Sequence, residues 1–147
     1  MKKILSFVTV LLTVSSAAFT QEKKESKDNI SVPAIVKTAL YKKYAEAKNV
    51  TWEKEKGNYE ANWGGKSGED NSVQFTPSGN FIEMVKAISV NQLPPDVIAY
   101  VKQHYQGAAI TEAGKVTDAK ENSFFEAEVH GKDIIFDEKG NFVKTEK

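Results

Sequence analysis

Apart from carboxylates, the residues that could carry acid–base or nucleophilic chemistry or bind a metal ion are few and scattered along the chain. The two histidines, His104 and His130, do not form a His-Glu-x-x-His arrangement. No Gly-x-Ser-x-Gly sequence marks an activated serine, because residues 64–68 read Gly-Gly-Lys-Ser-Gly. Cysteine is absent, which excludes thiol nucleophiles, disulfides and cysteine-bound metals. We therefore predict no catalytic residue, no metal ligand and no cofactor, and we do not expect an enzyme.

Carboxylates are plentiful, and their spacing is typical of solvated strand positions. Paired carboxylates can perform glycosidase chemistry when their surroundings separate their pKa values. Glu60, Glu126 and Glu128 alternate with apolar residues, however, as the polar face of a half-buried β-strand does. Residues 64–71 and 137–141 combine glycine with acids and could offer oxygen ligands to calcium, but neither has the EF-hand ligand spacing. Turn formation is the favoured explanation of both loops.

One set of residues remains as a candidate surface for binding another molecule. Three aromatic residues lie on neighbouring predicted strands of the first half, where they form either part of the core or a contact surface. A fourth, Phe124, points outward beside two glutamates if Phe125 points inward. Exposed aromatic side chains often mark recognition surfaces. The candidate partner-binding residues are Trp52, Tyr59, Trp63, Phe124, Glu126 and Glu128.

The N-terminal sequence has the features of a secretory signal peptide. Two lysines precede an apolar run that ends near Val14, and small residues follow. Cleavage is expected after Thr20, with Ala18 as the alternative, so residues 1–20 form the signal peptide. A membrane anchor is the less favoured interpretation, because the apolar run is shorter than the ~20 residues that cross a bilayer. We predict a periplasmic or secreted protein that is not embedded in a membrane.

Residues 21–30 form a charged leader that is expected to be flexible. Both charge signs are mixed in it and no apolar residue occurs before Ile30, so it cannot bury enough surface to become ordered. Without the signal peptide, 18 lysines face 20 acidic residues. This balance implies no electrostatic partner, and the absence of arginine disfavours nucleic-acid binding.

An internal repeat organises the rest of the chain. The segments that begin at Val73 and Ile134 share the pattern apolar-x-Phe-x-x-x-Gly-Asn-Phe-apolar, at an offset of 61 positions. The same offset aligns Pro33 with Pro94, Val36 with Val97, Leu40 with Val101 and Tyr44 with Tyr105. We predict two tandem units, residues 31–90 and 91–147.

Each unit is predicted to begin with a helix and to continue with antiparallel strands. Apolar residues recur at four-residue steps after Pro33 and after Pro94, which is a helical period with proline at its start. Alternating segments joined by glycine-containing turns follow each helix. The predicted strands are residues 50–53, 59–63, 72–76, 80–88, 110–117, 124–129, 133–136 and 141–145. The predicted class is α+β, with the helices packed on one face of the sheet.

The segments AKNVTWEKEKGNYEANW, FTPSGNFIEM and FDEKGNFVK support a family resemblance. From about residue 30 to residue 147, the chain resembles the PepSY-like, beta-lactamase-inhibitor-like proteins of Gram-negative envelopes. The resemblance implies two tandem α/β units whose sheets join or abut, with the face opposite the helices left open. It implies no activity. Secreted beta-lactamase inhibitors of similar architecture grip an enzyme with a concave sheet and rely on disulfides, so none of their residues is carried over to this cysteine-free chain.

Three functional hypotheses follow. The leading one is a non-catalytic periplasmic module that binds or inhibits another envelope protein or a peptide through its open sheet face. The alternative is an envelope protein that responds to a small ligand or to calcium through its acidic loops. The third is an uncharacterised hydrolase. The sequence assigns no oligomeric state.

Overall fold

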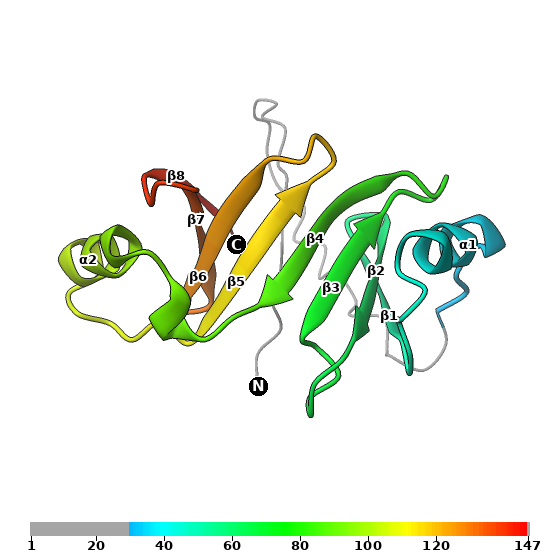
Figure 1. Ribbon diagram of the computed structural model, residues 1–147, viewed down its shortest axis with the longest axis horizontal. Coiled ribbons are helices and arrows are strands. Elements are labelled where there is room, and N and C mark those ends of the chain that lie inside the picture. Colours follow the sequence, from blue (N-terminus) through cyan, green and yellow to red (C-terminus); the bar gives the residue numbers. More distant parts are fainter. Residues whose placement is uncertain (1–29, 147) are drawn as a thin grey trace, which may run out of the picture.

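A computed structural model describes residues 30–146 of the chain. The predicted signal peptide and nearly all of the predicted leader lie outside the described residues. The first half contains α1 (Ala34–Lys43), β1 (Thr51–Glu55), β2 (Asn58–Trp63), β3 (Asn71–Phe75) and β4 (Phe81–Ala87). The second half contains the 3-10 helix η1 (Val90–Gln92), α2 (Pro95–His104), β5 (Glu112–Asp118), β6 (Ser123–Val129), β7 (Lys132–Asp137) and β8 (Phe142–Glu146) (Figure 1).

The eight strands form one antiparallel sheet in chain order. Figure 1 shows the strands running from β8 on the left to β1 on the right, with a helix at each end. β4 and β5 join the two halves, in a register that runs from Glu83 opposite Asp118 to Ala87 opposite Gly114. The α+β class is therefore confirmed, and the strands of the two halves form one continuous sheet.

The predicted helices form, and the residues at their ends explain their limits. The carbonyl of Pro33 accepts hydrogen bonds from the N–H groups of Val36 and Lys37, at 3.0 and 3.2 Å. Proline suits this position because its missing N–H would have no partner there. α2 begins in the same way after Pro94, and Gly107 follows its end with a φ of 73°, a conformation that favours glycine.

Two hairpins close through two-residue turns with positive φ at both positions. Lys56 and Gly57 join β1 to β2 with φ angles of 48° and 84°, and His130 and Gly131 join β6 to β7 with 56° and 70°. This is the backbone of a type I′ turn, whose twist matches that of paired strands. Asn58 and Lys132, which the sequence placed in the turns, belong to strands instead.

Two hydrophobic clusters form the core. The first contains Val36, Leu40, Ala47, Tyr59, Ala61, Trp63, Val73 and Phe75. The second contains Leu93, Val97, Val101, Ala113, Ala127, Val129, Ile134 and Phe136. Each joins helix residues to strand residues, and each fully buried apolar side chain stabilises the fold by about 1.5–3 kcal/mol.

The opposite face of the sheet carries polar and acidic side chains, because successive side chains of a strand point to opposite faces. We define the acidic face as the one that carries Glu53, Glu60, Glu83, Glu112, Glu126, Glu128, Asp133 and Glu146. The predicted solvation of its glutamates is wrong. Glu60, Glu126 and Glu128 are only 6%, 2% and 4% exposed. They lie on inner strands, where side chains of both neighbouring strands flank them; Glu128, for example, lies between Glu112 and Asp133.

The pairing registers of the two halves correspond, but not at one constant offset. The β3–β4 register shifts between Gln74 and Phe75, and the β7–β8 register shifts 61 positions later. In contrast, Tyr59 of β2 pairs with Phe75, whereas Phe125 of β6 pairs with Phe136, so these two strands correspond at 66 positions. The difference arises because a seven-residue loop, residues 64–70, follows β2, whereas a two-residue turn follows β6.

Candidate functional site

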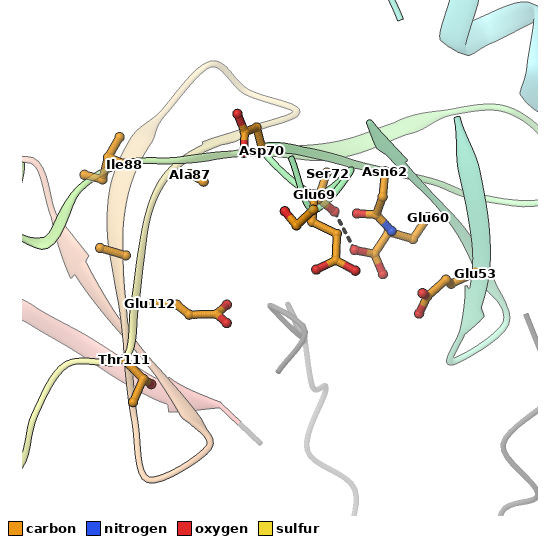
Figure 2. A pocket seen from close by; sticks show the side chains of 12 residues that line it. Glu53, Glu60, Asn62, Glu69, Asp70, Ser72, Ala87, Ile88, Thr111 and Glu112 are labelled. Atoms are coloured by element: carbon orange, nitrogen blue, oxygen red, sulfur yellow. Dashed lines mark hydrogen bonds between the residues drawn. The ribbon is translucent and has the colours of Figure 1, made fainter. Parts of the chain in front are cut away.

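The acidic face contains a pocket of about 280 Å³ between the two halves of the sheet. We call it the acidic pocket. Five carboxylates line it: Glu53, Glu60, Glu69, Asp70 and Glu112. None of the described residues that line it is a lysine or a histidine. Figure 2 shows Glu112 reaching in from one side and Glu53 and Glu60 from the other.

The β1–β2 hairpin supplies two of these carboxylates as a directly opposed pair. Glu53 pairs with Glu60 across the hairpin, and like charges in such positions destabilise a sheet. The hydroxyl of Ser72 on β3 donates a hydrogen bond to Oε1 of Glu60, which Figure 2 draws as a dashed line. This hydrogen bond holds the Glu60 side chain at the pocket wall.

The loop between β2 and β3 supplies Glu69 and Asp70. The carbonyl of Asp70 accepts a hydrogen bond from the N–H of Ala87 at 2.9 Å, which fixes the end of the loop beside β4. A Cβ atom at Gly65 would lie 2.0 Å from Oδ1 of Asp70, and Gly65 has a φ of 65°. Glycine is therefore needed here to let the Asp70 side chain lie against the loop. The sequence predicted this segment only as a turn, and the structure adds two acids of the pocket to it.

β5 links the pocket to a line of carboxylates across the second half. Glu112, Glu128, Asp133 and Glu146 face one another in succession across β5, β6, β7 and β8. We call these four residues the acidic row. Burial raises the pKa of Glu112, and the neighbouring Glu128 raises it further.

Hydrogen bonds and one ion pair offset part of this repulsion. The hydroxyl of Thr111 donates to Oε1 of Glu128 at 2.6 Å. At the sheet edge, the ammonium of Lys144 pairs with Oε1 of Glu146. These contacts lie at two positions of the acidic row, and neither reaches Glu112.

Glu126 is the most deeply buried carboxylate of the acidic face. Its Oε2 atom has no hydrogen-bond partner within the part of the chain that the structure describes. Burial raises its pKa well above the usual range for glutamate, and the carboxylates of Asp133 and Glu83 add to the shift. Beside it, Gly114 has no side chain, and a Cβ atom there would lie 2.8 Å from Cγ1 of Val85.

A further carboxylate of this region is shifted into the neutral pH range. Partial burial raises the pKa of Glu55, at the end of β1, to about 7, and the neighbouring Glu60 contributes to the shift. A carboxyl group of this kind changes its charge close to physiological pH. Glu55 lies two residues from Glu53, on the same side of β1, so the charge next to the acidic face depends on pH close to neutrality.

The other residues with chemical potential do not gather at this site. His104 is exposed and stacks on the ring of Tyr100 with a centroid distance of 3.9 Å, and His130 lies in an exposed turn. Oδ1 of Asp137 accepts hydrogen bonds from the N–H groups of Lys139 and Asn141, both at 2.9 Å. The 137–141 loop is thus a turn held by its own aspartate. Among residues 30–146, no group of three or more histidine, aspartate or glutamate side chains is arranged to hold a metal ion.

The six candidate residues predicted from the sequence divide between the two faces of the sheet. Tyr59 and Trp63 are buried in the first cluster and Trp52 packs against it, so these three are core residues. The register places Phe124 opposite Val116, on the same face as Glu126 and Glu128. Only the latter three therefore belong to one surface.

Sequence reasoning missed the acids that complete the site. Alternation along 51–55 places Glu53 on the same face as its hairpin partner Glu60, and this signal could have been used. Glu69 and Asp70 lie in a loop without periodicity. Asp133 and Glu146 join the acidic row only through pairing registers that the strand patterns alone do not determine.

Chemically, the site is suited to binding positive charge. Closely spaced carboxylates in partly desolvated surroundings attract ammonium and guanidinium groups more strongly than they would in water. Among the described residues, no helix is long and apolar enough to cross a membrane.

Several solved structures share this fold. A "putative periplasmic" protein of Bacteroides eggerthii aligns with a TM-score of 0.66 and 20% identity, over 79% of this chain and 88% of its own. A DUF2874 family protein of Bacteroides uniformis gives a TM-score of 0.64 and 24% identity, over 77% and 87%. A BLIP-like protein of Bacteroides fragilis gives 0.62 and 23%, over 81% and 88%.

Comparison of the sequence with protein families gives one assignment. No curated protein matches the chain. The family described as "Putative beta-lactamase-inhibitor-like, PepSY-like" matches residues 62–144, which is more than half of the 147 residues. The matched segment runs from the end of β2 into β8 and includes the acidic row up to Asp133. The chain therefore belongs to the PepSY-like, beta-lactamase-inhibitor-like family.

Proposed function

We propose that this protein is a non-catalytic binding or inhibitory module of the periplasm that acts on another envelope protein or a peptide through its acidic face. The main observation that supports this proposal is the arrangement of negative charge on the sheet. Carboxylates of β1, β2, β4, β5, β6, β7 and β8 lie on one face of a continuous sheet. Such a face repels itself, and a partner of complementary charge would relieve the repulsion.

The arrangement of the two clusters supports this use of the sheet. Val36 and Leu40 of α1 belong to the first cluster, and Val97 and Val101 of α2 belong to the second. The strand residues of both clusters alternate with those of the acidic face, so we infer that both helices cover the same side. The acidic face then remains for a partner.

Export to the periplasm is supported by the sequence and by one similar structure. Residues 1–20 have the charge, apolar run and small residues of a secretory signal peptide. The protein of Bacteroides eggerthii, which shares this fold, is described as periplasmic. We propose residues 1–20 as the signal peptide and residues 21–30 as a leader to the first unit.

We further infer that residues 31–90 and 91–147 arose by duplication. The N–H of Gly79 donates to the carbonyl of Thr76 at 2.8 Å, and 61 positions later Gly140 donates to Asp137 at 2.9 Å. Gly79 lies against Ile35 at the start of α1, and Gly140 lies against Asp96 at the same position of α2. Turn, bulge and helix contacts thus recur together, which supports a common origin better than the Gly-Asn-Phe match alone.

Calcium binding through the acidic loops is the alternative, and the two loops support it unequally. Asp137 is occupied by its own turn, whereas Glu69 and Asp70 of the first loop line the acidic pocket. Calcium takes six to eight oxygen ligands. Titration of the mature protein with calcium chloride, compared with an Asp70→Ala variant, measures this possibility directly.

Site-specific photo-crosslinking tests the proposed function. A photoreactive phenylalanine analogue replaces Phe124 on the acidic face, and a matched protein carries it at Tyr41, which is 47% exposed on α1. Both are expressed in the native envelope, illuminated and analysed by mass spectrometry. We expect one recurrent protein or peptide adduct at position 124, which excess unlabelled mature protein suppresses, and no such adduct at position 41.

Two results would contradict the proposal. The first is an absence of any recurrent adduct at position 124. The second is the same adduct at both positions, because a partner that meets both faces does not depend on the acidic face. Turnover of an envelope substrate that a carboxylate substitution abolishes would instead indicate a hydrolase.

A further inference from the structure

We propose that the partner of the acidic face is a basic polypeptide segment, and that it places a lysine or arginine side chain in the acidic pocket. This inference rests on the function proposed above and specifies the partner's chemistry. It concerns the space between Glu53, Glu60 and Glu112, and Glu126, which lies on the same face diagonally across from Glu112.

The first support is the charge of the pocket. Its five carboxylates come from β1, β2, β5 and the loop before β3 and line one space of about 280 Å³, which Glu112 enters from one side and Glu53 and Glu60 from the other (Figure 2). An ammonium or guanidinium group donates several hydrogen bonds and carries one positive charge. Such a group would face carboxylates of both halves of the sheet at once, Glu53 and Glu60 on one side and Glu112 on the other.

The second support is the unpartnered carboxylate of Glu126. The residue is 2% exposed, and its Oε2 atom has no hydrogen-bond partner among the described residues. A buried acceptor of this kind costs folding free energy unless a donor reaches it. Glu126 lies diagonally across from Glu112 on the same face, with the side-chain-free Gly114 between them in the pairing. The Val85 side chain fills the position next to Gly114, so the approach to Glu126 runs along the acidic face from Glu112.

The third support is a partly exposed apolar side chain next to the carboxylates. Phe124 lies on the acidic face two residues from Glu126 and is half-buried, whereas Val116 and Val85, in line with it on β5 and β4, are buried. Apolar contact at Phe124 beside acidic positions suits a chain in which basic and apolar residues alternate. A bare metal ion would make no use of this side chain.

The spread of the carboxylates also favours a polypeptide over a metal ion. A divalent cation requires several ligands that converge on one point, and no such group of three occurs among residues 30–146. The carboxylates instead extend along the sheet, with adjacent strands about 4.8 Å apart. An extended segment with several positive charges matches that distribution.

Binding of a defined peptide tests the inference. The probe is an eight-residue capped peptide that alternates lysine and valine, and the matched control peptide has glutamine in place of lysine. Isothermal titration uses the mature full-length protein and the variants Glu112→Gln and Glu126→Gln. The control variant is Glu138→Gln, in the exposed turn before β8. Circular dichroism verifies that each variant is folded.

We expect the lysine peptide to bind and the glutamine peptide not to bind. Each site variant should weaken binding about tenfold, as expected for the loss of one charge-assisted hydrogen bond. Glu138→Gln should leave the affinity unchanged, and rising salt should weaken binding. Equal affinity for the two peptides, or equal affinity of all variants, would overturn the inference.

Two further arms separate the inference from the proposed function and from metal binding. If the Phe124 crosslink forms but the lysine peptide does not bind, the inference fails and the proposed function stands. If neither occurs, both fail. Calcium chloride alone is titrated in parallel, and stoichiometric calcium binding that Glu112→Gln abolishes, without lysine-peptide binding, would assign the pocket to a metal ion instead.

Discussion

The single residue Glu126 lowers the stability of the fold, and it belongs to the surface that we propose binds a partner. A glutamate that is 2% exposed and lies near Asp133 and Glu83 must either lose its proton in an apolar, negatively charged environment or remain neutral. Either state costs free energy at neutral pH. Natural proteins often accept such a cost where a binding site requires it. The stability of this protein should therefore carry a measurable penalty from this residue.

That penalty predicts a specific pH dependence. The pKa of Glu126 is raised in the folded state, so between its unfolded value of about 4.3 and its folded value the folded protein binds more protons than the unfolded chain. Stability should therefore fall as pH rises above about 4.3. Glu126→Gln removes this slope and should stabilise the protein at pH 7, by about 1.4 kcal/mol for each unit of the shift lying below that pH.

Thermal unfolding followed by circular dichroism at pH 4.5, 6 and 7 measures this effect. Glu138→Gln, in an exposed turn, is the control and should retain the wild-type pH dependence. Glu55, with a pKa of about 7, adds a slope of the same sign, so the Glu126→Gln curve flattens without becoming level. A Glu126→Gln protein with an unchanged or steeper fall toward pH 7 would contradict the interpretation.

At the scale of elements, the turns before β4 and β8 position the helices as well as the strands. Gly140 has a φ of 84°, and a Cβ atom there would lie 3.0 Å from Cβ of Asp96, in the first turn of α2. Gly57 has the same φ in the β1–β2 turn, but nothing lies within 4 Å of its Cβ position. A substitution at Gly57 therefore tests backbone strain alone, whereas a substitution at Gly140 tests the same strain together with contact to α2.

Alanine at these two glycines should have unequal effects. Gly57→Ala costs only the strain of positive φ, about 1 kcal/mol. Gly140→Ala adds the close approach to α2, and we expect a total of about 2–3 kcal/mol. Urea unfolding measures both values. Equal losses for the two variants would show that the β7–β8 turn does not support α2.

Most elements could be predicted from the sequence, whereas their assembly could not. Pro33 and Pro94 mark both helices, and alternation marks the strands, because these signals are local. Tyr59 corresponds to Phe125 at 66 positions, which the 61-position repeat could not predict. The seven-residue loop after β2 corresponds to a two-residue turn after β6, and this difference of five residues shifts the register. The burial of Glu126 depends on the neighbours of β6, which only the pairing reveals.

At the scale of the whole molecule, the β4–β5 pairing determines whether the halves unfold together. The two hydrophobic clusters are separate, but five residue pairs, from Glu83–Asp118 to Ala87–Gly114, bond β4 to β5 in the centre of the sheet. Backbone hydrogen bonds lost from one strand leave its neighbour with an unpaired edge. We therefore expect damage to one cluster to destabilise the other half as well.

Both tryptophans, Trp52 and Trp63, lie in the first half, so their fluorescence reports on that half while circular dichroism reports on the whole sheet. Ile134 is 0% exposed in the second cluster, and Ile134→Ala should cost about 2–5 kcal/mol. Ile134→Val, at about 0.5–1.5 kcal/mol, is the milder variant if the alanine protein does not fold. In urea, both probes should shift to the same lower midpoint. A tryptophan transition that stays at the wild-type midpoint while the circular dichroism transition splits would show that the halves unfold independently despite their shared sheet.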